Sequence, residues 1–205
     1  MNAYNREAVD WWHQHTQVIR LYPKEVIEAL LLGAQRCSYH DGFGKFENTE
    51  YSPFDDHANG GLGEKGFVHV NGGKVDETVY MDGRGDRHRP DCELPDGRRV
   101  EVKTIRWVEW NGDLKMERVE IANCEWVCLA QRVQNHQRRD LLDVIRIFPI
   151  WRMAVIRPFF IEKPYTRLSN GLQKMTPAFE WYNHLEVLDP ALHEPQANVE
   201  LAVTR

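Results

Sequence analysis

The pattern of hydrophobic and polar positions changes along the chain and divides its 205 residues into four stretches. We expect a helical extension over residues 1–40, a long loop over 41–63 and a strand-rich core over 64–165. Residues 166–205 are expected to hold one short helix, around Pro177 to Leu188, followed by a polar tail. A chain of this length is enough for one domain with a sizeable core.

In the first stretch, apolar residues recur at helical spacing. Pro23 suits the first turn of a helix, and "HDG" at residues 40–42 is a stop signal. The apolar positions between them are Val26, Ile27, Leu30, Leu31, Ala34 and Cys37. The earlier run "VDWWHQHTQVI" is interpreted as another helix. Its His13 and His15, two positions apart, would not share a helix face, which argues against a metal site there.

Residues 41–63 show no periodicity and are rich in Gly, Asn, Asp and Pro, as "DGFGKFENTEYSPFDDHANGGLG" shows. This composition favours a long loop, and long loops in compact domains tend to be functional or mobile. Asp55, Asp56 and His57 are a candidate metal-binding group, although a solvated turn is the more common role of such a run.

The third stretch alternates between apolar and polar residues, as strands do. Its longest run, "RRVEVKTIRWVEW", ends at "NGD", which is a strong signal for a hairpin, and "LKMERVEI" follows it. Further strand-like runs are "ETVYM", "CEWVCLAQRV", "VIRIF" and "WRMAVIRPFFI". Together these runs predict that a β-sheet forms most of the core.

The composition is that of a globular protein, with 42% hydrophobic and 28% charged residues. The formal net charge is −5, so a nucleic-acid partner would have to be attracted by a local basic surface. No apolar run approaches the ~20 residues that span a bilayer, so we expect no membrane contact. The beginning, "MNAYNREAVDWW", lacks the apolar segment of a secretory signal, which favours a cytoplasmic location with reduced cysteines.

One short stretch, "RPDCELPDGRRVEVKTI" at residues 89–105, concentrates the candidate chemistry. Alternate side chains of a strand share a face, so Glu101 and Lys103 should point the same way. The turn "PDG", with its proline in the favoured place, should fold the preceding strand back as an antiparallel partner. Asp91 on that strand would then approach Glu101 and Lys103. The ordinary alternative is a surface salt bridge at Lys103, which contributes little to stability.

A comparison among the lysines supports a specific role for this set. Lys103 and Lys115 are the two lysines with an acid two residues earlier in the chain. Asp113, the acid before Lys115, belongs to the "NGD" turn and is not expected on a strand face. The set at residues 91–103 is therefore the one in which a hairpin would bring the acids and the lysine together.

Pro90-Asp91 followed by Glu101-Val102-Lys103 resembles the signature of the PD-(D/E)xK nuclease superfamily. The order and spacing of residues in "PD…LPDG…VEVK" are also similar to those of the bacteriophage junction resolvases within this superfamily. The tight match covers residues 90–103, and a looser match in strand order extends to about residue 157. The resemblance implies an α/β (α+β) fold with a restriction-endonuclease-like core, in which helices flank a mixed central sheet. Residues 64–165 would be this nuclease core, with the N-terminal helices as an extension.

The resemblance also implies a metal-dependent nuclease that hydrolyses phosphodiester bonds in DNA. Hydrolysis near neutral pH needs a hydroxide and a stabiliser of negative charge, and Mg²⁺ or Mn²⁺ supplies both. Asp91 and Glu101 would be metal ligands, with the Val102 carbonyl as a third. Lys103 would orient the attacking water or stabilise the developing charge. An acid from an early helix often assists in this family, and Glu64 is the candidate here, with Glu47 and Glu50 as alternatives.

Basic side chains around the acids would hold the phosphate backbone, a contact that gives affinity without sequence information. One group brackets the acids and a second follows the "CEWVCLAQRV" run. The first comprises Arg84, Arg87, Arg89, Arg98, Arg99 and Arg106, and the second comprises Arg132, Arg138 and Arg139.

The preferred interpretation is an endonuclease of phage origin, with a role in recombination or defence inside a bacterial or infected host cell. The alternative is a protein of the nuclease fold that binds nucleic acid without cutting it. Keeping two acids and a lysine together favours the enzyme, because a binding protein has no need of them. RNA as the substrate, exonuclease action and a homodimer stay open at this point.

Overall fold

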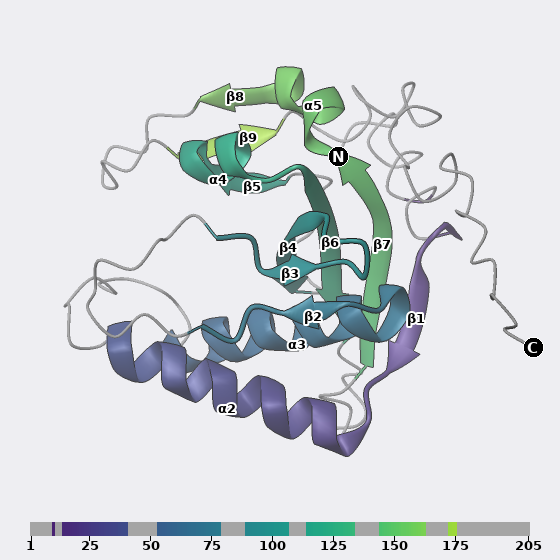
Figure 1. Ribbon diagram of the computed structural model, residues 1–205, viewed down its shortest axis with the longest axis vertical. Helices are drawn as coiled ribbons and strands as arrows, with labels where there is room; N and C mark the ends of the chain where they lie inside the picture. The colour runs from purple at the N-terminus through teal and green to yellow at the C-terminus, as the bar shows by residue number, and fades with distance from the viewer. Residues whose placement is uncertain are drawn as a thin grey trace, which may run out of the picture.

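The computed structural model describes residues 10, 14–40, 53–78, 89–106, 114–133, 144–162 and 172–175. These residues form a mixed α+β architecture, in which two long helices are stacked below a six-stranded sheet in the view of Figure 1. The predicted class, a mixed sheet with helices, is confirmed at this level. Neither long helix, nor any other within the described ranges, has the length and apolar character that crossing a membrane requires.

The six-stranded sheet has the strand order β1-β7-β6-β4-β3-β2. In that order its strands are β1 (Gln17–Arg20), β7 (Val144–Arg152), β6 (Trp126–Arg132), β4 (Arg99–Arg106), β3 (Cys92–Glu93) and β2 (Lys74–Val75). β4 and β6 are parallel, and every other neighbouring pair is antiparallel. The three long strands therefore lie at the centre, with short strands at both edges.

A smaller antiparallel sheet has the order β5-β9-β8 and lies near the start of β6 and the end of β7 (Figure 1). Its strands are β5 (Lys115–Glu117), β9 (Leu172–Met175) and β8 (Phe160–Glu162). The short helix α4 (Arg118–Asn123) leads from β5 into β6. From β7, α5 (Met153–Ile156) and the 3₁₀ turn η2 (Arg157–Phe159) lead into β8.

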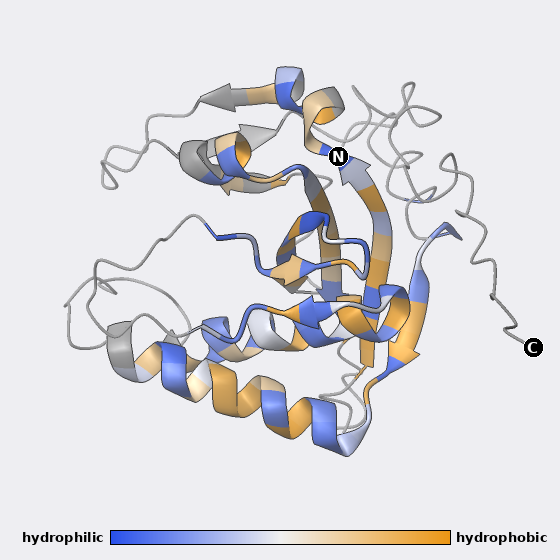
Figure 2. Cartoon of the chain, viewed as in Figure 1, coloured by the Kyte–Doolittle hydropathy of each residue, from blue (hydrophilic) through white to orange (hydrophobic). Residues whose placement is uncertain are grey.

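The long helix α3 (Pro53–Asn71) lies between α2 (Pro23–His40) and the sheet, where it packs on β4, β6 and β7 (Figure 1). Apolar residues of α3 and of the central strands form the core between the helix and the sheet, and the hydrophobic colouring of β6 and β7 in Figure 2 follows this burial. The core includes Leu62, Phe67, Val100, Val102, Cys128, Ala130, Ile145 and Ile147.

Glycine lets α3 approach both of its neighbours closely. A Cβ atom on Gly61 would come within 2.8 Å of the backbone oxygen of Ala29 on α2. A Cβ atom on Gly63 would collide with the side chain of Thr104 on β4. Any larger residue at these two positions would push α3 away from α2 or from the sheet.

The prediction of a loop over residues 41–63 is wrong for residues 53–63, which form the first half of α3. Glycine-rich sequence has a low intrinsic helix propensity, and here tertiary packing overrides it. Apolar residues of α3 also do not gather on one face, because the helix is covered on two sides. Asp55 and Asp56 are exposed in its first turn, where carboxylates stabilise a helix by interacting with the positive end of its dipole. Residues 41–52 lie outside the described residues.

Three further local predictions are corrected. Gln17–Arg20, expected to be helical, is strand β1, because it pairs with Val144–Ile147 and so joins the main sheet. The run "LKMERVEI" forms β5 and then α4, and in the described residues β5 pairs with β9 and not with β4, whereas "NGD" lies outside the described residues. In "WRMAVIRPFFI", a helical turn and a 3₁₀ turn come before β8. The expected helix around Pro177 lies outside the described residues.

Two neighbouring glycines of α3 provide a matched test of this packing. Gly61→Ala should lower the free energy of unfolding by about 1–3 kcal/mol, because the added methyl group overpacks the contact with α2. At Gly60 an added Cβ atom would meet only Glu64 Oε1, at 3.8 Å. Gly60→Ala should therefore raise the free energy of unfolding by up to ~1 kcal/mol through helix propensity.

Urea denaturation measures the free energy of unfolding of the two glycine variants, and the comparison is valid if their m-values are equal. Effects of the same sign and size would mean that α3 does not lie tightly against α2.

Candidate active site

The hairpin between β3 and β4 positions the first acid. The Gly97 amide donates to the Leu94 carbonyl at 2.9 Å, and the Leu94 amide donates to the Arg98 carbonyl at 2.8 Å. Gly97 has φ of +87°, a left-handed conformation that glycine adopts without steric cost. The strands pair in the register Cys92↔Val100 and Glu93↔Arg99. The antiparallel pair expected from "PDG" is thus confirmed.

Asp91 lies one residue beyond the last paired position, so the register continues toward Glu101. Its Oδ2 atom accepts a hydrogen bond of 2.8 Å from the Val102 amide. β3 is only two residues long, so β4 from Glu101 onward has no described strand beside it on this side. Because the amide and carbonyl of one strand residue point to the same side, the Val102 carbonyl faces the same open edge as Asp91.

Lys103 shares a face of β4 with Glu101, as predicted. Its Nζ atom lies 2.7 Å from Glu101 Oε1 and 2.6 Å from Glu120 Oε1 on α4. The Glu101 side chain is only 7% exposed. Burial alone would lower the pKa of Lys103, but the charges of Glu101, Glu120 and Asp91 raise it above its usual value. Lys103 is therefore a firmly held ammonium group between two carboxylates.

Glu64, the predicted helix acid, lies in the middle of α3 with its side chain only 3% exposed. Arg36 on α2 binds it with both guanidinium ends, Nη1 to Oε1 at 2.6 Å and Nη2 to Oε2 at 3.1 Å. Arg36 Nη2 also donates to the Asp76 carbonyl at 3.2 Å. Cys92 on β3 contacts the Glu64 carbonyl through its sulfur at 3.9 Å. Glu64 is thus held under the start of the hairpin, with its charge balanced by Arg36.

The four carboxylates of this acid cluster, Asp91, Glu101, Glu64 and Glu120, face two cations, Lys103 and Arg36. When all are ionised, the cluster carries an excess of two negative charges. Burial, and then the neighbouring Glu64, raises the pKa of Asp91 to about 7. Burial, and then Asp91, raises the pKa of Glu101 to about 8. Burial also raises the pKa of Glu64 despite Arg36.

The donor set at this edge suits a hard divalent cation. Asp91 and Glu101 supply two carboxylates and Val102 a carbonyl on one stretch of the hairpin, and Mg²⁺ typically takes one or two protein carboxylates and keeps several waters. Within the described ranges, no three His, Cys, Asp or Glu side chains are arranged to hold a metal ion by themselves. The fit therefore depends on a main-chain oxygen and water in addition to the two acids. A bound cation would also neutralise the two excess negative charges.

The predicted phosphate-binding arginines have different surroundings. Arg89 is exposed just before Asp91. Arg98 donates through Nε to Asp96 at 2.6 Å, and its guanidinium lies over the Trp126 ring. Arg132 instead donates to Asn59 on α3 at 2.6 Å. Arg106 ends β4, but its side chain is not described. Arg84, Arg87, Arg138 and Arg139 lie outside the described residues, as do Glu47 and Glu50.

Arg36 and Glu120 are members of the cluster that the motif does not contain. Arg36 follows Ala29, Leu32 and Gly33, all buried, at helical spacing. An arginine on the buried face of a helix requires a carboxylate partner, so this signal was present in the sequence. Glu120 offered no such signal, because the alternation of "LKMERVEI" favours a strand and hides α4.

The chain matches no model of a known protein family, and no curated protein is significantly similar to it.

The raised pKa values make the stability of the metal-free protein depend on pH. The folded state holds protons on Asp91 and Glu101 more tightly than the unfolded chain, so their contribution to stability is complete only below about pH 4. It is lost as the pH rises through about 7 for Asp91 and about 8 for Glu101. In EDTA, Tm should therefore fall from about pH 5 to about pH 8, and Mg²⁺ should raise Tm more at the higher pH.

Thermal melts of Asp91→Asn and Asp96→Asn test this origin. The asparagine at position 91 keeps an oxygen for the Val102 amide and should flatten the pH dependence. Asp96 is an exposed turn acid whose pKa is lowered by hydrogen bonds from Arg98, which outweigh its slight burial. Asp96→Asn should leave the slope between about pH 5 and about pH 8 unchanged. Equal slopes in all three proteins would assign the pH dependence to other groups.

Proposed function

We propose that this protein is a metal-dependent nuclease that hydrolyses phosphodiester bonds in DNA, as an endonuclease. One observation carries the proposal: Asp91, Glu101 and Lys103 converge at the open edge of β4 with uncompensated negative charge around them. A salt bridge on the protein surface would not need this burial or this excess of carboxylates. A restriction-endonuclease-like core is part of the proposal, supported by the β3–β4 hairpin and its position in a mixed sheet.

In this proposal a bound Mg²⁺ or Mn²⁺ supplies a hydroxide near neutral pH and polarises the phosphoryl group. Asp91 and Glu101 hold the cation, together with the Val102 carbonyl. The Val102 amide fixes the orientation of Asp91, so one carboxylate oxygen is positioned before the substrate binds. Pre-positioned ligands of this kind need no rearrangement during the reaction.

Lys103 has the electrostatic role. With the cation in place, the carboxylates no longer need the ammonium to balance them, and its charge acts on the attacked phosphate and the water beside it. Glu120 on α4 also binds the Lys103 ammonium, at 2.6 Å, and this second ion pair limits the motion of the lysine side chain. Glu64 and Arg36 form the base of the site. They act through Asp91, because the charge of Glu64 is the second cause, next to burial, of the raised pKa of Asp91.

Lys103→Met should retain binding of metal and DNA but lose cleavage by on the order of 10²-fold or more, as expected for one electrostatic stabiliser. Lys65→Met is the matched control. Lys65 also bridges two carboxylates, Glu28 at 3.0 Å and Glu77 at 2.8 Å, and its side chain is 12% exposed. DNA affinity is measured in Ca²⁺ and cleavage in Mg²⁺ on the same preparation.

Cleavage by Lys65→Met should match that of the wild type. If Lys103→Met loses affinity and cleavage equally, or if both lysine variants behave alike, Lys103 is a structural residue and the catalytic role is wrong.

Asp91→Asn and Glu101→Gln should each abolish cleavage of supercoiled, linear, single-stranded and branched DNA in Mg²⁺ or Mn²⁺. Both substitutions remove a charge and keep the side-chain shape. Asp96→Asn, four residues from the pair Cys92↔Val100 in the same hairpin, should cut at the wild-type rate.

Wild-type protein that binds DNA but cuts none of these substrates with either metal would favour the alternative, a nuclease-fold protein that binds without cutting.

A further inference from the structure

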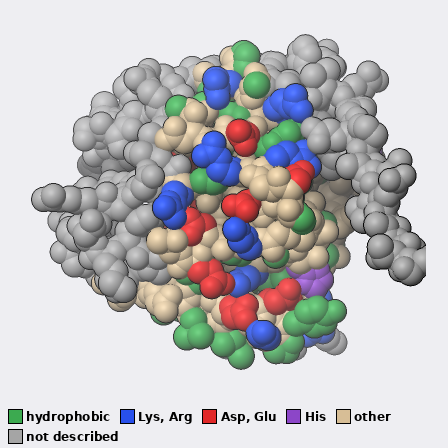
Figure 3. All heavy atoms as spheres, in the orientation of Figure 1, with side chains coloured by type: hydrophobic (Ala, Val, Ile, Leu, Met, Phe, Trp, Pro, Cys, Tyr) green, Lys and Arg blue, Asp and Glu red, His purple; other side chains and the backbone are tan. Residues whose placement is uncertain are grey.

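A second site lies next to the acid cluster. A pocket of about 620 Å³ is lined by Arg98, Arg99, Arg152 and Arg157, together with Trp126 and Glu125. The four arginines come from the hairpin turn, β4, the end of β7 and η2. In Figure 3 basic side chains gather toward the top of the face, where α4 and α5 lie in Figure 1. We call this the arginine pocket.

The arginine pocket carries a strong positive charge. Glu125 is the acid among its described lining residues, and its exposed carboxylate is 3.9 Å from Arg99 Nη2, which is long for an ion pair. Four guanidinium groups thus line the pocket, with Glu125 in its wall and Asp96 paired to Arg98 at its rim. This is the reverse of the acid cluster, although the whole chain is acidic. Such a local field attracts an anion.

The guanidinium groups are held in place before any ligand arrives. Trp126 is only 4% exposed, and the guanidinium carbons of Arg98 and Arg152 lie 5.2 and 4.8 Å from the centre of its ring. A guanidinium stacked on a ring can still donate from its edge, as Arg98 Nε does to Asp96 at 2.6 Å. Arg157 is fixed by a hydrogen bond of 3.0 Å from Nη2 to the Ile121 carbonyl. Holding these side chains in advance lowers the entropy cost of binding.

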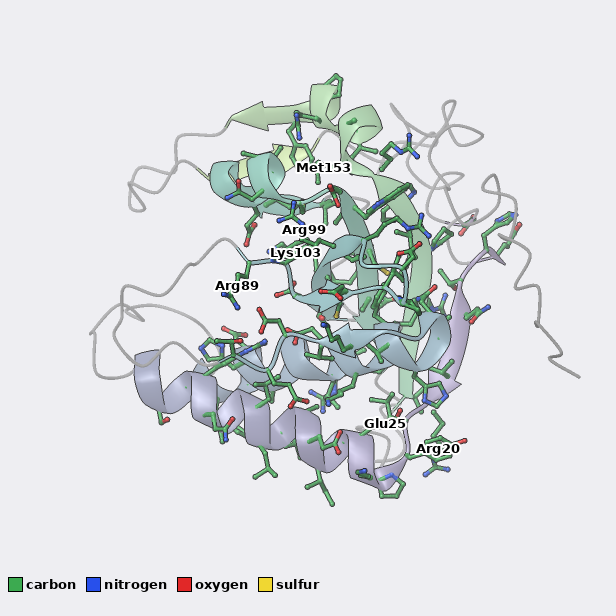
Figure 4. All side chains as sticks on the ribbon, viewed as in Figure 1. Arg20, Glu25, Arg89, Arg99, Lys103 and Met153 are labelled. Atoms are coloured by element: carbon green, nitrogen blue, oxygen red, sulfur yellow. The ribbon has the colours of Figure 1, made fainter. Side chains whose placement is uncertain are left out.

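The pocket and the acid cluster are built on the same two elements, β4 and α4. Arg99, Glu101 and Lys103 are two positions apart along β4 and therefore lie on one face of it. Figure 4 labels Arg99 and Lys103 close to each other. Four residues of strand separate their Cα atoms by about 13 Å. The short helix α4 links the same two sites, with Glu120 at Lys103 and Asn123 at the pocket wall. A ligand that extends over a few repeating units would reach both.

We propose that the arginine pocket holds a phosphate of the DNA backbone next to the bond that is cleaved, an inference that rests on the proposed nuclease function. Planar guanidinium groups match the paired oxygens of a phosphate. Trp126 is too deeply buried to stack on a base, so the pocket recognises the backbone without reading sequence. It places the strand so that a phosphate a few units further along reaches Asp91 and Lys103.

The test is the salt dependence of DNA binding, measured in Ca²⁺ by fluorescence anisotropy. In Arg99→Gln/Arg152→Gln the slope of log affinity against log salt should become shallower by about 0.7–0.9, the contribution of the one phosphate contact that is lost. The loss should be the same on two DNAs of unrelated sequence. Arg20→Gln is the control, since Arg20 pairs with Val144 at the opposite end of β7 from Arg152, and it should keep the wild-type slope.

Two further arms separate charge from folding and backbone from end. Arg99→Lys/Arg152→Lys keeps both charges and should retain most of the slope, whereas a loss in both double variants would mean disrupted packing around Trp126 and would overturn the proposal. A closed circular single strand has no terminal phosphate and should show the same change. A change confined to linear DNA with a 5′-phosphate would show that the pocket binds an end and would also overturn it.

Cleavage assays on the same proteins keep this inference distinct from the proposed function. Wild-type cleavage together with an unchanged slope in Arg99→Gln/Arg152→Gln would refute the arginine pocket and leave the nuclease standing. A pocket-dependent slope in a protein that never cuts DNA would refute the nuclease, and with it the claim that the phosphate lies beside a cleaved bond.

Discussion

The close packing of α3 between α2 and the sheet is the constraint on which the rest of the structure depends. Gly61 and Gly63 remove the side chains that would keep the three layers apart. At this short separation Arg36 on α2 reaches Glu64 on α3, and Glu64 in turn lies under Cys92 at the start of the hairpin. Glycines that look unfavourable for a helix are thus what allows α3 to form part of a site.

The acid cluster and the arginine pocket place opposite charges close together within a chain of net negative charge. The negative charge is concentrated where a cation would bind, and it is partly buried and partly paired. The positive charge is concentrated in the arginine pocket, which meets the same face of β4 at Arg99. Separation by a few residues of one strand is sufficient, because fields at this range act locally and are screened beyond about 10 Å in salt. The net charge of the chain therefore says little about either site.

The hairpin of residues 91–103 was predictable because all the determinants of its geometry lie within a few residues of one another. The turn residues, the strand alternation and the two acids are local features, and the antiparallel pair that they predict is the one observed. The helix α3, the partner role of Arg36 and the position of Glu120 were not predictable in this way. Each depends on a contact between residues far apart in sequence. The helical spacing of Arg36 after Ala29 and Gly33 indicated a carboxylate partner, but it did not indicate that Glu64 is that partner. The prediction of a helix at Gln17–Arg20 was wrong for the same reason, because the partner of strand β1 is the distant β7.

The pairing of β1 with β7 has a consequence for how the chain is made. Gln17 lies opposite Ile147, so the main sheet joins residues near the start of the chain to residues that leave the ribosome much later. Until then β1 has no partner, and afterwards it covers the edge of β7, an apolar strand that would otherwise be open to pairing with another chain. Contacts of such long sequence separation slow folding and lengthen the exposure of aggregation-prone edges. The nascent protein is thus most prone to aggregation in the interval before β1 pairs with β7.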